Sequence, residues 1–136
     1  MRSLASVIRL HRWKVDEKRR EVADLEAMAE ALRQRLLDLE QEIEREREGA
    51  DAQVVGFAYA AYVRAAIARR ERFQRSIAEA ETAVAGKRDE LAEAFRELKK
   101  FEVAEARRLE LAAEESARRE RAASDETALN IHRRRE

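Results

Sequence analysis

The sequence predicts an all-α protein in which two long helices, the second longer than the first, form an intramolecular antiparallel coiled-coil hairpin. Three observations predict this fold. Charged residues make up 43% of the 136 residues and proline is absent, a composition typical of long helices and coiled coils. Apolar residues recur with heptad spacing in two separate stretches. A short uncharged segment with glycines separates these stretches, as expected for the bend of a hairpin.

The first helix is predicted from about residue 3 to residue 47. Ser3 is placed to cap its first turn, since a serine hydroxyl can accept a hydrogen bond from the unpaired amides there. Spacings of three and four alternate without interruption along one seam, and the flanking positions are almost all charged. The seam consists of the a positions Ile8, Val15, Val22, Ala29, Leu36 and Ile43 and the d positions Leu4, His11, Lys18, Leu25, Leu32, Leu39 and Glu46.

The bend is expected at residues 48–57, where two of the three glycines of the chain lie. Charge is absent from residues 52–63, a run too short to span a bilayer as a helix. Tyr59 falls on the seam of the second helix, so we expect it to be structural. Phe57 and Tyr62 are candidates for contact with a protein partner, because exposed aromatic side chains are typical anchors. The alternative is that both fold back over the open end of the coiled coil.

The second helix is predicted over about residues 58–123, and its seam contains more alanine than the first. The seam consists of the a positions Val63, Arg70, Ile77, Val84, Leu91 and Leu98 and the d positions Tyr59, Ala66, Phe73, Ala80, Lys87, Ala94 and Phe101. After Phe101 the pattern fails, but pairs of opposite charge spaced by four residues favour an exposed helix to about Ala123. The hairpin thus comprises residues 1–123, and residues 124–136 are expected to be a flexible basic tail.

The two seams have equal lengths of roughly six heptads, about 63 Å each. A short connection between equal seams favours antiparallel neighbours in one chain, with residue i opposite roughly residue 105 − i. This pairing brings Lys18 and Lys87 close together at seam positions. Polar seam residues commonly fix the register of a coiled coil, and we interpret these lysines in that way rather than as a regulatory site.

The composition argues against several classes of function. The 29 basic and 29 acidic residues give no net charge, so nothing points to a nucleic-acid partner; a nucleic-acid-binding hairpin is a distant alternative. Cysteine is absent, and the two histidines, His11 and His132, are far apart in the sequence, which argues against a metal site. Two helices enclose no water-poor site that could shift a carboxylate pKa for catalysis. The sequence therefore predicts a protein that is not an enzyme and needs no cofactor.

A basic run lies near the start of the first helix. Its members are Arg9, His11, Arg12, Lys14, Lys18, Arg19 and Arg20. One interpretation is a solvated face balanced by glutamates further along the chain. The other is a docking surface for an acidic ring or groove, and the residues alone leave both open.

Three stretches of sequence resemble the FliJ family, the coiled-coil component of the bacterial flagellar type III export apparatus. They are LxxxIR at residues 4–9, KxDEKRR at residues 14–20 and FRELKKFE at residues 95–102. The resemblance implies a partner of the export ATPase that looks like the stalk subunit of rotary ATPases. It also implies a cytoplasmic protein, peripheral at the flagellar basal body, that contacts the membrane-embedded export gate and substrate chaperones.

The resemblance also implies which residues would contact these partners. Those facing the ATPase would be the helix after Phe101 and the basic residues Arg9, Arg12, Lys14, Lys18, Arg19 and Arg20. Those contacting the gate would be Leu36, Leu39, Phe57, Tyr62 and Phe73. A stalk of this kind is expected to be a monomer that does not insert into the membrane.

Two alternatives remain open at this point. The first is a structural or adaptor coiled coil unrelated to secretion, which would self-associate and ignore any ATPase. The second is a stalk of the related injectisome, which shares the architecture of the flagellar protein.

Overall fold

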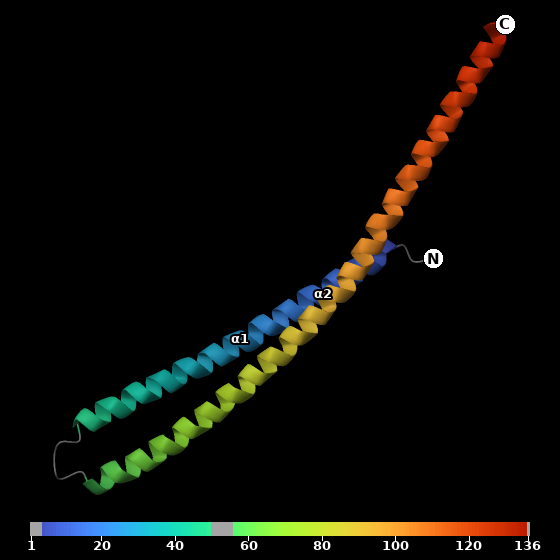
Figure 1. The fold of residues 1–136 in the computed structure, drawn as a ribbon. Helices are drawn as coiled ribbons and strands as arrows, with labels where there is room; N and C mark the ends of the chain where they lie inside the picture. The colour runs from blue at the N-terminus through green and yellow to red at the C-terminus, as the bar shows by residue number, and fades with distance from the viewer. Residues whose placement is uncertain (1–3, 50–55, 136) are drawn as a thin grey trace. The chain divides into compact units, whose positions relative to one another are not determined.

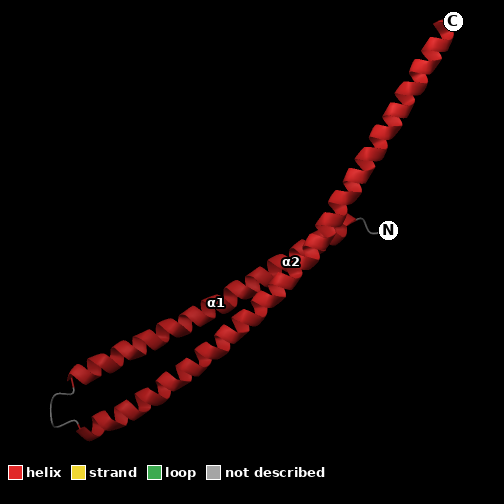
Figure 2. Cartoon of the chain, viewed as in Figure 1, coloured by secondary structure: helices red, strands yellow, loops and turns green. Residues whose placement is uncertain are grey.

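The structure is a computed structural model that describes residues 4–49 and 56–135. Helix α1 is Leu4–Gly49 and helix α2 is Gly56–Arg135. Both are α-helices throughout, as Figures 1 and 2 show, and the part of the chain that the structure describes contains no strand. The predicted all-α hairpin with a longer second helix is confirmed, since the two helices pack against each other.

Contacts within the molecule group the residues into two units, and each unit contains a stretch of both helices. The central unit is Lys14–Ala94. The terminal unit combines Met1–Trp13 with Phe95–Glu136.

In the central unit the two helices run antiparallel. Lys18 pairs with Glu90, Arg33 with Glu81, and Glu42 with Arg69, so residue numbers rise along α1 as they fall along α2 (Figure 1). The buried apolar side chains of this unit are Val15, Val22, Ala29, Leu39, Ala66 and Val84. Every one of them is a predicted seam residue, so hydrophobic burial along one narrow seam holds the pair together.

The terminal unit has a smaller core. Ile8 and Leu98 are buried, and the rings of His11 and Phe101 stack with centroids 4.6 Å apart and an angle of 27° between their planes. The prediction that His11 is a partly buried seam residue is therefore confirmed. From residue 106 to residue 135, every side chain of α2 except the half-buried Ala117 is exposed. We call residues 106–135 the extension.

The predicted register is wrong by about one heptad. The relation i with 105 − i would place Arg33 opposite Arg72, but its partner is Glu81. It would place His11 opposite Ala94, but its partner is Phe101. Heptad periodicity fixes which residues face the partner helix and leaves the offset open by multiples of seven. The charges beside the seam select the offset, because the observed register brings opposite charges together.

The predicted boundaries also need correction. Glu48 belongs to α1 and Phe57 to α2, so both helices enter the predicted bend; residues 50–55 and the predicted cap Ser3 lie outside the described residues. Helix α2 continues to Arg135, beyond the predicted end near Ala123. Neither glycine nor proline interrupts this stretch, and the basic residues of its last turn interact favourably with the helix dipole. The flexibility of residues 124–136 stays a prediction.

Candidate functional site

The basic run of α1 begins in the terminal unit. Arg9 is exposed, and its guanidinium donates a hydrogen bond to the hydroxyl of Ser6 at 3.3 Å. Arg12 lies 4.0 Å from Glu102 across the helix pair, and its side chain is 61% exposed. A pair this long between exposed groups is weak, so the positive charge of Arg12 remains available at the surface.

The run continues in the central unit. Lys14 is exposed and, within the described residues, forms no ion pair. Arg19 lies 3.7 Å from Asp16 and Arg20 lies 2.6 Å from Glu17, both within one turn of α1. Such local pairs on an exposed helix face are easily exchanged for a partner's carboxylates, because each contributes little to stability.

Lys18 differs from the other predicted docking residues because it is held in a cluster between the helices of the central unit. Its ammonium group contacts Glu21 at 3.2 Å and Glu90 at 3.5 Å. Lys87 contacts the same carboxylates, Glu21 at 3.1 Å and Glu90 at 2.9 Å. We call Lys18, Glu21, Lys87 and Glu90 the quartet. The geometry favours a structural role for Lys18 over contact with a partner.

The contacts in the quartet shift the pKa of Glu21, Glu90 and Lys87. Hydrogen bonds from Lys87, and then from Lys18, lower the pKa of Glu21. The hydrogen bond from Lys87 also lowers the pKa of Glu90. In turn, hydrogen bonds to Glu90 and then to Glu21 raise the pKa of Lys87. All these groups stay charged near neutral pH, so the quartet acts as a set of ion pairs and not as an acid–base site.

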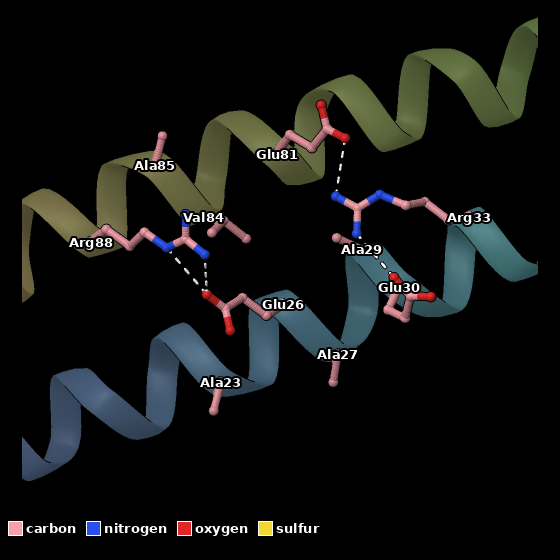
Figure 3. A pocket seen from close by; sticks show the side chains of 10 residues that line it. All are labelled: Ala23, Glu26, Ala27, Ala29, Glu30, Arg33, Glu81, Val84, Ala85 and Arg88. Carbon is pink, nitrogen blue, oxygen red and sulfur yellow. Dashed lines mark hydrogen bonds and ion pairs between the residues drawn. The ribbon is translucent and has the colours of Figure 1, made fainter.

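A shallow groove of about 580 Å³ runs between the helices of the central unit (Figure 3). Its floor is formed by Ala29 and Val84 with other small side chains. One end is bordered by Arg88, whose Nε donates to Glu26 at 3.1 Å; the other by Arg33, which donates to Glu81 at 3.0 Å. These arginines are engaged in ion pairs, so the groove is a bridged part of the helix interface rather than a cleft with converging catalytic groups.

The residues predicted to contact the gate fall into different environments. Phe57 is 87% exposed, the most exposed large apolar side chain among the described residues. Leu39 is only 2% exposed in the seam, so a partner cannot reach it while the helices are paired. Leu36 and Phe73 are half-buried seam residues. Only Phe57 has the full exposure that a contact residue needs.

Tyr62 is half-buried, and its hydroxyl is enclosed without a hydrogen-bond partner among the described residues. Burial raises the pKa of Tyr62, and the negative charges of Glu42 and Glu46 raise it further. The tyrosine therefore packs back towards α1, as the alternative interpretation of the bend aromatics proposed for it.

The sequence interpretation missed Leu10 and Trp13 as candidate contact residues. Trp13 is 59% exposed and Leu10 is 44% exposed. Both lie within the basic run, three residues apart and therefore on one face of α1. The sequence does contain a signal for this site, because Trp13 is the only tryptophan of the chain and lies outside the seam. Tryptophan and arginine are the side chains most enriched in the energetically dominant parts of protein interfaces.

The extension also presents apolar side chains. Val103 at its base and, within it, Leu109, Leu111, Leu129 and Ile131 are each about half exposed. Its described ion pairs are local, as between Arg119 and Glu115 at 2.7 Å.

Other kinds of site find little support. Within residues 4–49 and 56–135, no group of three or more acidic, histidine or cysteine side chains could hold a metal ion. Over the same ranges, neither helix has a stretch that is long and apolar enough to cross a membrane.

The comparison with family models gives a match. The model of the family described as the flagellar FliJ protein matches residues 1–136, the whole chain. The comparison with curated proteins finds no match, and neither does the comparison with solved structures. A family match over the whole length, on a helical hairpin of the expected kind, identifies the chain as a member of the FliJ family and thus as a coiled-coil component of the flagellar protein export apparatus.

Proposed function

We propose that the chain is a non-enzymatic stalk in the cytoplasm, peripheral at the flagellar basal body, that couples the export ATPase to the export gate. The family match over residues 1–136 carries this proposal. The match is to a flagellar family, so it supports the flagellar rather than the injectisome system. The proposal includes export chaperones as further partners, without assigning residues to them.

The ATPase would dock on the basic run of α1. Arg12 makes only a long ion pair, Lys14 makes none among the described residues, and Arg19 and Arg20 pair within their own turn. Carboxylates lining a ring would pair with these basic side chains; of the ion pairs just named, the weak one between Arg12 and Glu102 is the one that joins the two helices. This proposal leaves Lys18 out of the docking residues, because its ammonium group already contacts Glu21 and Glu90 within the quartet.

The test is co-purification with the flagellar export ATPase after reversal of charge. The variant Arg12→Glu, Lys14→Glu, Arg19→Glu, Arg20→Glu should lose binding and ATPase stimulation. A matched control changes four exposed arginines of α2 outside the run: Arg64→Glu, Arg70→Glu, Arg72→Glu and Arg75→Glu. The control has the same net charge and should keep binding. Equal binding of the ATPase by both variants would contradict the docking proposal.

Phe57 would contact the cytoplasmic domain of the gate, because its ring is exposed at the first turn of α2. Phe57→Ser should weaken binding to that domain while leaving ATPase binding unchanged. Met28→Ser serves as the control, since Met28 is an exposed apolar residue (60%) of the same unit. Gate binding that the Phe57 variant retains, or that the Met28 variant loses to the same extent, would contradict the assignment.

A stalk pairs its helices within one chain and should be a monomer. The competing hypothesis, a scaffold unrelated to secretion, expects self-association, and the exposed apolar side chains of the extension are where it would occur. Light scattering over a range of concentrations separates the two, and a stable oligomer would count against the stalk.

A further inference from the structure

The register of the central unit is set by charges beside the seam. In the heptads of α1 and α2, Glu26 and Arg33 occupy e positions, and so do Arg88 and Glu81. These residues pair across the helices, Arg88 with Glu26 and Arg33 with Glu81. Each of these e positions of α1 therefore meets an e position of α2 of opposite charge.

The apolar residues of the seam do not select this register. A slip of one heptad keeps a positions against a positions and d positions against d positions, because both seams repeat every seven residues. Ala29, which lines the groove with Val84, would then face Ile77, another apolar a residue. Ile43 would face Val63 instead of Arg70, while Leu36 would face Arg70 instead of Ile77, so these a-position pairs neither gain nor lose an apolar match overall.

The flanking charges reject the slipped register. The partner of Glu26 would change from Arg88 to Glu81, and Arg88 would come opposite Arg19. Both new pairs join like charges. Lys18 would also come level with Lys87, which places a third pair of like charges together.

A slip in the other direction is rejected in the same way. It would place Arg33 opposite Arg88 and Glu40 opposite Glu81. The charge pattern therefore opposes both neighbouring registers, although the seam tolerates them.

We propose that the central unit has a second register one heptad away, which its seams accept, and that the e-position charges and the quartet act as the lock that excludes it. The slip that pairs Glu26 with Glu81 moves one helix along the other by about 10 Å. It also brings Phe57 level with Glu48, within the described end of α1, so that the position of the phenyl ring along α1 depends on the register. This last consequence for the gate rests on the proposed function; the lock does not.

The test exchanges two charges on α2. Glu81→Arg with Arg88→Glu places like charges together in the observed register and opposite charges together in the slipped one, without changing composition. A matched control adds Glu26→Arg and Arg33→Glu. In the observed register, the control again pairs opposite charges. In the slipped register, it places the arginines introduced at positions 26 and 81 opposite each other, which joins like charges.

The readout is the distance between spin labels on the intact chain, measured by double electron–electron resonance. The chain has no cysteine, so Ala31→Cys and Ala92→Cys, both at exposed positions of the central unit, take the labels specifically. The exchanged variant should show a distance changed by about 10 Å from the parent, longer where residue 26 meets residue 81 and shorter where residue 33 meets residue 88, and the control should return to the parent distance.

A second variant keeps the test interpretable if the exchanged variant fails to fold. Adding Lys18→Glu to the exchanged variant removes the lysine pair of the slipped register and further weakens the observed one. An unchanged distance in a helical protein, in both variants, overturns the proposal. Loss of the helical circular dichroism signal in both variants overturns it equally, since it means that the seams do not accept the second register.

Discussion

The central unit and the extension are both rich in charged residues and alanine but have different sources of stability. In the central unit, apolar residues such as Leu39 and Val84 are buried, and ion pairs join residues far apart in the sequence. In the extension, leucines such as Leu111 are half exposed, and described ion pairs such as Arg119 with Glu115 join neighbouring turns. The comparison teaches that helix-forming composition alone does not make a stable element: tertiary burial does.

The largest effect should come from shortening the same side chain in both regions. Leu39 is 2% exposed, so Leu39→Ala should lower the free energy of unfolding by about 2–5 kcal/mol through lost burial and the cavity left behind. Leu111 is 54% exposed, so Leu111→Ala should change it by less than about 0.5 kcal/mol. Urea titration followed by circular dichroism measures both. Equal effects would mean that the extension has a packed partner.

A gain of stability is expected at Gly86, in the middle of the paired part of α2. A methyl group there would meet no atom within 4 Å, so Gly86→Ala fits without a clash. It should raise the free energy of unfolding by about 0.5–1 kcal/mol, because glycine costs a helix more backbone entropy than alanine. The converse change in the extension, Ala113→Gly, should leave the main unfolding midpoint unchanged. A drop in that midpoint would contradict the separation of the two regions.

The quartet predicts an acid dependence that the extension lacks. Its lysines hold the pKa of Glu21 and Glu90 below the ordinary value of 4.5. A lowered folded-state pKa contributes stability that is present above pH 4.5 and is lost as the pH falls through the folded value. Glu21→Gln with Glu90→Gln should therefore flatten the decline in stability below that pH. Glu115→Gln, in the extension, is the control and should leave the pH profile of the midpoint as in the parent.

On the alkaline side the sign is the opposite. The carboxylates raise the pKa of Lys87 above 10.5, so the stability it contributes is present below that pH and is lost as the pH rises through the folded value. Lys87→Met should remove this alkaline dependence, which the same urea titrations would detect.

The smallest effect is expected at Tyr62. Its hydroxyl is enclosed without a described hydrogen-bond partner, and an unsatisfied buried group is unfavourable. Tyr62→Phe should be neutral or slightly stabilising in thermal melts. Tyr59→Phe is the comparison, since Tyr59 belongs to the predicted seam itself. A clear loss of stability in the Tyr62 variant would indicate a hydrogen bond to the hydroxyl in solution.

Most of the fold was predictable from the sequence because burial follows heptad phase. Among the described residues, every buried apolar residue is on a predicted seam. The register was not predictable from the seam lengths, since periodicity repeats every seven residues; comparing the charges of Glu26 and Glu81 with those of Arg33 and Arg88 would have selected it. The predicted end of α2 was too early because a helix can continue where its seam stops.

The candidate site was harder to predict than the fold. A basic run is visible in sequence, but only the three-dimensional contacts separate Lys18, held by the quartet, from Lys14, which is unpaired among the described residues. Likewise, Leu39 and Phe57 are both apolar in sequence, while one is buried and the other exposed. How accessible each side chain is depends on its packing against the partner helix. The local sequence pattern does not carry that information.

Hydrogen exchange on the intact, free protein tests most directly the claim that only paired helix is stable. We expect the amides of α1 and of the paired part of α2, at seam positions such as Val22 and Val84, to exchange only through global unfolding. Amides of the extension, for example those of Leu111 and Leu129, should exchange faster by orders of magnitude. Equal protection of both regions would contradict the account, because it would require a partner surface for the extension.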